Sequence, residues 1–324
     1  MIAIVRETYG PPDVLRRKDV PAPVPSDKQV LVKVVAASVA KGDWEILTGS
    51  PLWVRLVGFG LVRPKIGILG YNFAGRIEAV GCQVTEFKVG DEVFGDILQC
   101  GLGAFAEYVC VPEDAAMVRK PAGLPFEEAA SLPEAGFIAL QAIRDKGRVK
   151  PGHNVLIIGA GGGAGSFAVQ YAKSLGAIVT GVDRTEKLDL MRSLGADHTI
   201  DHTREDFAER GMAYDLILDT VGVRSMTTWR RLLRPNGIYL AVGGSVAHLL
   251  KTLLVGAWVT WTTAKTIGVL AVRPNKEDLF AIIALLESGE IAATVDRRYP
   301  LSQVPDALRY LGQGLSKGKI VITI

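Results

Sequence analysis

The pattern of hydrophobic positions divides the chain into two kinds of segment. In the first part, short runs rich in valine and aromatic residues lie between Gly, Pro or Asp, as in QVLVKVVAA (29–37), GRIEAVG (75–81) and FAEYVCV (105–111). Regularly spaced short strands predict a barrel-like β domain. The chain returns to this pattern at its end, where the helical run 278–289 is followed by the strand-like KIVITI (319–324). We expect this last strand to pack against the N-terminal domain.

The middle of the chain alternates between strand-like and helical runs. VLII (155–158) is wholly apolar, as in a strand buried on both faces, and the helical run after it ends at Leu175, before Gly176. Further strands are predicted at 177–182, 198–200, 214–219 and 238–242. Repeated β-α units predict an α/β fold with a doubly wound parallel sheet.

A glycine-rich loop joins the first of these strands to its helix. Gly159, Gly162 and Gly165 recur at every third residue. In such a loop one glycine permits a tight turn, one lets the backbone approach a pyrophosphate, and one allows close packing of helix on strand. A second register through Gly159, Gly161 and Ala164 fits equally, and the sequence leaves both open. The predicted dinucleotide site therefore comprises Gly159, Gly161, Gly162, Gly163, Ala164 and Gly165.

The end of the second predicted strand gives mixed signals about the cofactor. Asp183 can accept both ribose hydroxyls of NAD and repels the 2′-phosphate of NADP. Arg184 and Lys187 follow and can pair with that phosphate. We predict that the protein uses both NADP and NAD, with a mild bias toward NAD(H). Thr185 is predicted to cap the next helix.

The length and composition of the chain exclude several classes of protein and partner. A chain of 324 residues suits two domains, and its formal charge of +3 is dispersed without a dense Lys/Arg block, so nucleic acid is not an expected partner. Cys82, Cys100 and Cys110 are too few and too scattered for a disulfide framework, which favours a reducing compartment. We expect a cytoplasmic protein, because the N-terminus also lacks the pattern of a signal peptide.

The most apolar stretch of the chain is 252–264. It is shorter than the roughly 20 apolar residues that a spanning helix needs. We predict that this stretch forms a buried or pocket-lining helix, and we expect no membrane partner.

Five segments carry a family resemblance over nearly the whole chain. The chain resembles quinone-oxidoreductase-like members of the medium-chain dehydrogenase/reductase superfamily, related to the zinc-type alcohol dehydrogenases, in segments 75–95, 103–114, 159–177, 214–222 and 295–311. The resemblance implies a GroES-like β-barrel domain over 1–120, completed by 270–324, and a Rossmann domain over 121–269. It also implies an active site in the cleft between the domains and a homodimer that forms through the Rossmann sheet edge.

The resemblance also predicts whether the protein binds a catalytic metal ion. Alcohol dehydrogenases of this superfamily hold a catalytic zinc at positions that match Ala40, Tyr71 and Glu134. Alanine has no lone pair to offer, tyrosine is not a usual zinc ligand, and one carboxylate does not hold zinc. The resemblance therefore implies a zinc-free member. Without a Lewis acid, the natural acceptor is an activated one such as a quinone or an α,β-unsaturated carbonyl.

Several positions depart from the family pattern. Relatives carry Asn where Ala40 stands, Asp where Asn72 stands, and Thr beside the nicotinamide where Ile138 stands. These changes indicate a more apolar substrate or weakened catalysis. Tyr71 and Lys41 remain as candidate catalytic donors. The other candidates are Ala40, Trp44 and Asn72 for the substrate pocket, and Ile138, Val242, Gly243 and Lys319 for the cofactor.

We therefore expect a metal-free, NAD(P)H-dependent oxidoreductase that transfers hydride to a small quinone or enone. Two alternatives stay open: a catalytically weak dinucleotide-binding sensor or scaffold, and a zinc-free alcohol or aldehyde dehydrogenase.

Overall fold

The computed structural model describes residues 1–52, 54–222 and 224–324. The chain forms two compact units. Unit 1 comprises Met1–Glu134, Pro274–Ala284 and Ala293–Ile324, and unit 2 comprises Ala135–Arg273 and Leu285–Ala292.

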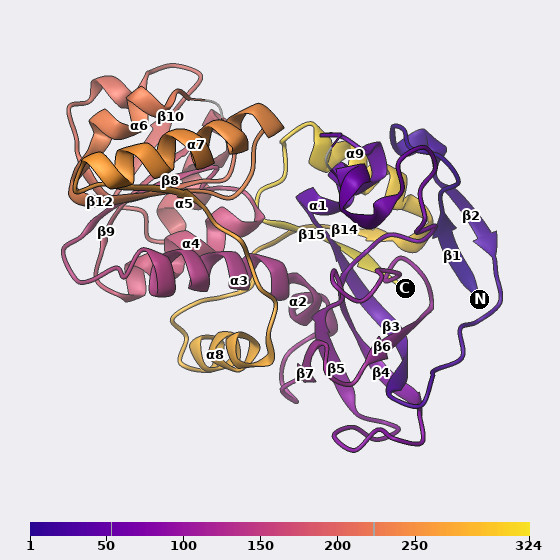
Figure 1. Cartoon of the computed structure of the whole chain (residues 1–324). Helices are drawn as coiled ribbons and strands as arrows, with labels where there is room; N and C mark the ends of the chain where they lie inside the picture. The colour runs from indigo at the N-terminus through magenta and orange to yellow at the C-terminus, as the bar shows by residue number, and fades with distance from the viewer. Residues whose placement is uncertain (53, 223) are drawn as a thin grey trace. The chain divides into compact units, whose positions relative to one another are not determined.

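Unit 1 is built on a seven-stranded sheet in the order β14-β15-β3-β4-β5-β7, with β6 paired to β3 (Figure 1). The last strand of the chain runs antiparallel to β3, with Ile322 opposite Ala37. The prediction that the C-terminal strand joins the N-terminal part is therefore confirmed. The strands are β3 (Gln29–Val39), β4 (Asn72–Val80), β5 (Glu92–Asp96), β6 (Tyr108–Pro112), β7 (Ala116–Arg119), β14 (Val295–Pro300) and β15 (Lys319–Thr323), with β1 (Ile2–Val5) and β2 (Arg16–Asp19) in a separate pair.

In the described part of unit 1, the α-helices that belong to it wholly are α1 (Lys41–Thr48), α2 (Phe126–Ser131) and α9 (Val304–Gly312). Helix α1 begins where the Asp43 carboxylate accepts the Ala40 N–H, and it ends at Gly49, whose φ of 61° suits glycine. Helix α9 buries Val304 and Leu308, one turn apart, in the apolar core that it shares with the sheet.

Unit 2 contains a six-stranded, all-parallel sheet in the order β10-β9-β8-β11-β12-β13. This order confirms the predicted doubly wound sheet and places its switch point between β8 and β11, where such sheets bind dinucleotides. The strands are β8 (Asn154–Ile158), β9 (Ile178–Asp183), β10 (His198–Asp201), β11 (Tyr214–Asp219), β12 (Leu233–Ala241) and β13 (Thr266–Val269).

Helices cover both faces of this sheet. Figure 1 shows α6 (Met226–Leu232) and α7 (Val246–Thr262) on one face and α3 (Pro133–Leu140) and α4 (Gly163–Ser174) on the other. Trp229 of α6 stacks between Phe207 and Tyr239 in the core. The remaining helices and helical turns are α5 (Leu188–Ser193), α8 (Lys276–Glu287), Pro12–Val14, Arg55–Phe59, Gln141–Lys146, Thr185–Lys187, Phe207–Glu209 and Leu301–Gln303.

Two local predictions are wrong. Thr185 does not cap α5, because its hydroxyl donates to Asp201 instead. The stretch 252–264 lies mostly on α7, and only one face of that helix is buried, whereas Trp261 is 86% exposed. An apolar run without polar interruptions gives no signal of which face meets the core. Among the described residues, no helix combines the length and the apolar character needed to cross a membrane.

Candidate functional site

Two glycines of the loop after β8 are required by the protein's own packing. Gly159 has a φ of 80°, and a Cβ there would lie 2.3 Å from Thr220 Oγ1 on the neighbouring strand end. A Cβ on Gly165 would lie 2.1 Å from the carbonyl oxygen of Gly159. The loop therefore turns at Gly159 and packs α4 onto β8 at Gly165, as in the register with glycine at every third position.

Gly162 differs, because a side chain there would be crowded far less than at Gly159 or Gly165. It precedes α4 in an extended conformation (φ −88°), and the nearest atom to a Cβ would be the Gly159 carbonyl oxygen at 3.3 Å. The first N–H groups of α4, from Gly163 and Ala164, have no intrahelical acceptors, and no side chain of the described residues caps them. A glycine-lined helix N-terminus of this kind fits the pyrophosphate of a dinucleotide.

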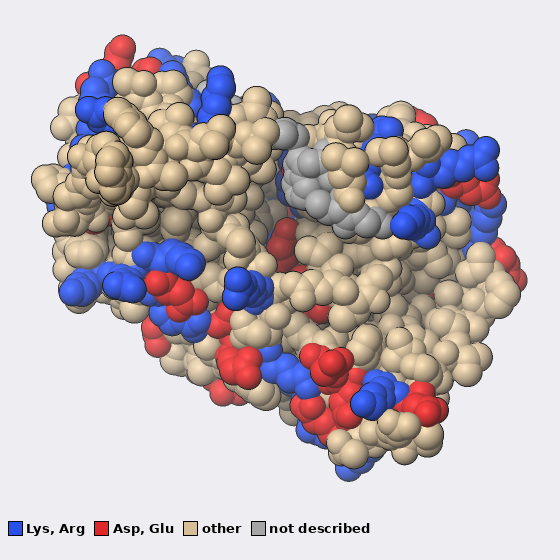
Figure 2. Space-filling model, in the orientation of Figure 1, with Lys and Arg blue, Asp and Glu red and all other residues tan. Residues whose placement is uncertain are grey.

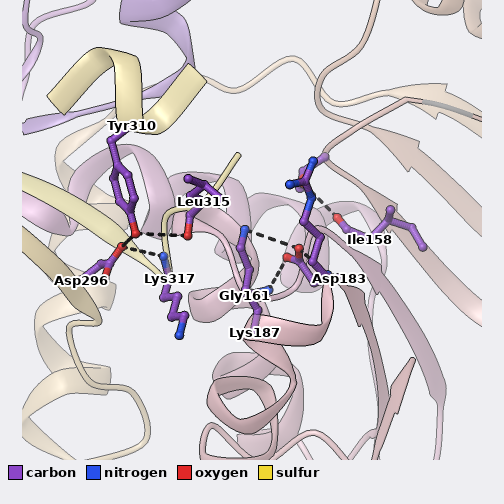
Figure 3. A network of polar contacts seen from close by, with 10 residues as sticks. Ile158, Gly161, Asp183, Lys187, Asp296, Tyr310, Leu315 and Lys317 are labelled. Carbon is purple, nitrogen blue, oxygen red and sulfur yellow. Dashed lines mark hydrogen bonds and ion pairs between the residues drawn. The ribbon is translucent and has the colours of Figure 1, made fainter. Parts of the chain in front are cut away.

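The Asp183 carboxylate ties this loop to the end of β9 (Figure 3). One oxygen accepts the Gly161 N–H at 3.0 Å. The other accepts the Arg184 N–H at 2.9 Å and lies 3.4 Å from Lys187 Nζ. Both oxygens are thus engaged within the protein, and Lys187 offsets part of the charge.

A second buried network supports the carboxyl end of β11. Asp219 Oδ1 accepts the N–H groups of Val221 and Gly222 at 2.9 and 2.8 Å. The Tyr239 hydroxyl donates to Asp219 Oδ2 at 2.8 Å and lies 3.0 Å from His248 Nε2 on α7. This network fixes the loop at the switch point of the sheet.

The other predicted cofactor residues are distributed over both units. Val242 and Gly243 follow β12, and the Val242 N–H donates to the Asp219 carbonyl at 2.8 Å. Ile138 is buried on α3 in unit 2. Lys319 belongs to unit 1, at the start of β15.

Unit 1 brings together the side chains of three distant segments. The Tyr71 hydroxyl donates to Glu134 Oε1 at 2.8 Å, and Lys319 Nζ lies 3.0 Å from Glu134 Oε2. The Glu134 N–H donates to Asn72 Oδ1 at 2.9 Å. The Lys319 side chain is 3% exposed and Tyr71 is buried, whereas the Glu134 side chain is 21% exposed. Glu134 is therefore the member of this cluster that solvent or a substrate can reach.

Burial sets the protonation of this cluster. It raises the pKa of Tyr71 well above its usual value, and the nearby charges of Glu134 and Asp43 raise it further, so the phenol stays protonated. Burial also raises the pKa of Asp43 to about 7, although its carboxylate accepts N–H groups from Ala40 and Gly70. The pKa of buried Asp96 is raised to about 7 for the same first reason.

Two buried polar atoms beside the cluster lack partners. Asn72 Nδ2 and Ser38 Oγ make no hydrogen bond to any described residue. Ser38 and Asn72 are opposite each other on β3 and β4. Buried polar groups without protein partners usually bind ordered water, so these two fully buried atoms are candidate partners of an internal water.

The remaining predicted pocket residues lie around α1. Ala40 is buried just before the helix, and Lys41 is exposed at its first residue. Trp44 is half-buried, and its ring faces Gly312 so closely that a Cβ there would lie 2.4 Å from it. The sequence did not identify Ser38 or the link between Lys319 and Glu134, because neither has a local motif. Among the described residues, no three His, Cys, Asp or Glu side chains are grouped as a metal ion would require.

Comparisons with known proteins agree with this architecture. Residues 26–122 match the alcohol dehydrogenase GroES-like domain, 194–322 match the zinc-binding dehydrogenase family, and 137–233 match the alanine dehydrogenase/PNT C-terminal domain. The chain is 35% identical to 2-methylene-furan-3-one reductase of Solanum lycopersicum over 97% of this chain and 76% of that protein. It is 30% identical to the NADPH-dependent alkenal/one oxidoreductase of Arabidopsis thaliana chloroplasts, over 99% of this chain and 79% of that protein.

A solved structure gives the same result at the level of the fold. The quinone oxidoreductase of Coxiella burnetii matches with a TM-score of 0.90 and 30% identity, covering 100% of this chain and 99% of that one. The chain therefore belongs to the quinone-oxidoreductase-like group of the medium-chain dehydrogenase/reductase superfamily.

Proposed function

We propose that the protein is an NADP(H)-dependent reductase of quinones or α,β-unsaturated carbonyl compounds and works without a metal. The observation that carries this proposal is the Tyr71–Glu134–Lys319 cluster. Tyr71 and Glu134 stand at positions that the resemblance matches to zinc ligands, and there the Lys319 ammonium already pairs with the carboxylate. These residues do not fit a zinc ion, so an activated acceptor is the appropriate substrate. The names of the enone and quinone reductases among the relatives support the same reading.

The loop of Gly162 would hold NADPH, which would supply a hydride for the β-carbon of the acceptor. We propose that the Glu134 carboxylate relays the proton that completes the reduction, taking it from solvent and passing it to the acceptor, and that Tyr71 and Lys319 stabilise the carboxylate between these two transfers. Asn72, which is fully buried, holds the Glu134 backbone through its Oδ1.

The remaining predicted site residues keep secondary roles in this proposal. Lys41 is a second candidate donor, because its ammonium is exposed. Ala40 and Trp44 line the apolar part of the substrate pocket. Ile138, Val242 and Gly243 contact the cofactor.

A substrate screen tests the reaction class. We expect the protein to oxidise NADPH with enones, enals or quinones and to turn over simple alcohols poorly. Elemental analysis should find far less than one zinc per chain, and chelators should leave the rate unchanged. Alcohol oxidation without enone reduction, or stoichiometric zinc, would contradict the proposal. NADPH binding without turnover of any acceptor would favour the sensor or scaffold instead.

We further propose that the protein uses both NADP and NAD. The engaged Asp183 carboxylate supports this, because Lys187 offsets the charge that repels a 2′-phosphate. Replacing Asp183 by Ser should shift the ratio of kcat/KM toward NADPH by about tenfold or more, or roughly 1.4 kcal/mol.

The Asp183→Asn variant is the matched control for that experiment. It keeps an oxygen that can accept the Gly161 N–H but removes the charge. Equal shifts in Asp183→Asn and Asp183→Ser would show that charge sets the preference. If both cofactors lose affinity equally in Asp183→Ser alone, the carboxylate only holds the loop and the proposed role in selectivity is wrong.

Three further expectations complete the proposal. We propose domains of 1–120 with 270–324 and of 121–269, which limited proteolysis tests. We propose a cytoplasmic location, which the free state of Cys82, Cys100 and Cys110 supports. We propose a homodimer through β13, one of the two edge strands of the parallel sheet, which analytical ultracentrifugation tests.

A further inference from the structure

Helix α7 exposes an apolar face that the fold of unit 2 leaves uncovered. Its inner face buries His248, Thr252 and Val259 against the sheet. Almost directly opposite lies a stripe at helical spacing that we call the outer face of α7, with exposures of 53%, 74%, 56% and 86% for Leu250, Leu254, Trp258 and Trp261, respectively. The surface over α7 is mostly neither acidic nor basic (Figure 2).

An exposed face of this kind is unusual. A surface helix normally places polar residues opposite its buried face, and a helix that is apolar on both faces is normally covered. Two exposed tryptophans next to exposed leucines therefore indicate an interaction surface rather than scattered apolar residues.

The charge around this face has one sign. No Asp or Glu occurs between Asp219 and Glu277. Within that segment Arg224 and Arg234 are paired to carboxylates of other segments. The cations on or next to α7 without an ion pair among the described residues are Arg230, Arg231, Lys251 and Lys265. The outer face thus combines exposed tryptophan and leucine with unopposed positive charge.

We propose that the outer face of α7 docks on the surface of an anionic lipid bilayer. Tryptophan is favoured at the membrane–water boundary, where its ring is partly buried and its N–H stays hydrated. Nearby lysine and arginine gain energy from anionic headgroups. The helix is too short to span, but a helix that lies in the interface has no such length requirement. The protein then takes up an apolar quinone or enone at the phase in which such molecules concentrate, so this last step rests on the proposed function.

A second copy of the chain fits the outer face less well. A symmetric contact through α7 places the same patch against itself. Lys251 and its neighbouring cations would then face their own counterparts without a carboxylate from the segment to offset them. The lipid surface supplies the negative charge that this segment lacks.

Vesicle flotation of the full chain tests the proposal independently of activity. We expect binding to vesicles of phosphatidylcholine mixed with phosphatidylglycerol, little binding to phosphatidylcholine alone, and weaker binding at high salt. Trp261→Glu should weaken binding to the mixed vesicles by at least about tenfold, since it replaces an exposed tryptophan of the contact by a negative charge that anionic headgroups repel. Lys251→Glu should also weaken it.

Val24→Glu is the matched control, because Val24 is also 86% exposed but lies in unit 1. It should bind vesicles as the parent protein does, and all variants should keep the parent's unfolding temperature and NADPH affinity. Three results would overturn the proposal: no binding to anionic vesicles, unchanged binding by Trp261→Glu, or self-association that Trp261→Glu abolishes without vesicle binding. Failure of the enone screen with retained vesicle binding would contradict the proposed function but not the docking.

Discussion

Replacing Gly162 by Val is expected to raise the Kd for NADPH at least about a hundredfold, or roughly 2.7 kcal/mol, with little change in the free energy of unfolding. The backbone at Gly162 is extended, which a β-branched residue adopts readily, and the nearest atom to the new Cβ would be 3.3 Å away. The methyl groups would instead occupy the space in front of the first N–H groups of α4, where a pyrophosphate has to approach. Titration calorimetry measures the first effect and chemical denaturation the second.

The control for this experiment is Gly165→Val in the same loop. A Cβ there would come within 2.1 Å of the Gly159 carbonyl oxygen, so the helix has to move away from β8. We expect this variant to lose about 3 kcal/mol of stability through overpacking, and to lose NADPH affinity only as a consequence. Unchanged NADPH affinity in Gly162→Val would show that the loop does not hold the cofactor.

The sequence predicted the parallel sheet well because its strands carry local signals. VLII at 155–158 is buried throughout, and Gly176 and Gly195, which follow α4 and α5, stand at positive φ. It failed on β13 (Thr266–Val269), which is short and follows the apolar run of α7 without a turn signal. The sequence also predicted a buried helix where α7 exposes one face, because hydropathy reports the composition of a helix and not what packs against each of its faces.

The candidate site separates into a local part and a non-local part. The cofactor loop could be predicted because Gly159 to Gly165 are consecutive and their spacing has a physical reason. The Glu134–Lys319 pair joins residues 185 apart in the chain, and no pattern links them until β15 has paired with β3. Lys319 was assigned to the cofactor by resemblance, and the structure shows that its ammonium pairs with Glu134; a role toward the cofactor stays a prediction.

The second large effect is expected at Glu134. Replacing it by Gln should lower kcat for enone reduction by about 10²-fold or more, within the usual range for loss of a general acid. The amide keeps the shape of the side chain and can still accept a hydrogen bond from Tyr71, but it cannot release a proton.

Tyr71→Phe should lower kcat less than Glu134→Gln, because the Tyr71 hydroxyl acts through Glu134. Since the pKa of Tyr71 is raised well above 10, the pH profile of the parent should show no loss of rate from phenol ionisation up to about pH 10.

Glu127→Gln separates a catalytic effect from a merely structural one. Glu127 lies on α2 in the same unit, its side chain is 33% exposed, and it pairs with Arg298 at 2.6 Å, so its loss also leaves a cation without a carboxylate. Glu127→Gln should keep kcat, whereas Glu134→Gln should lose it while the Kd for NADPH stays unchanged, because Glu134 contributes to proton transfer and not to dinucleotide binding. A solvent deuterium isotope effect on kcat should accompany proton transfer in the parent, and it should increase in Glu134→Gln, where water has to replace the carboxyl group. Equal rates for the two glutamine variants would mean that Glu134 serves only as the ion-pair partner of Lys319, and that the proton comes from another group.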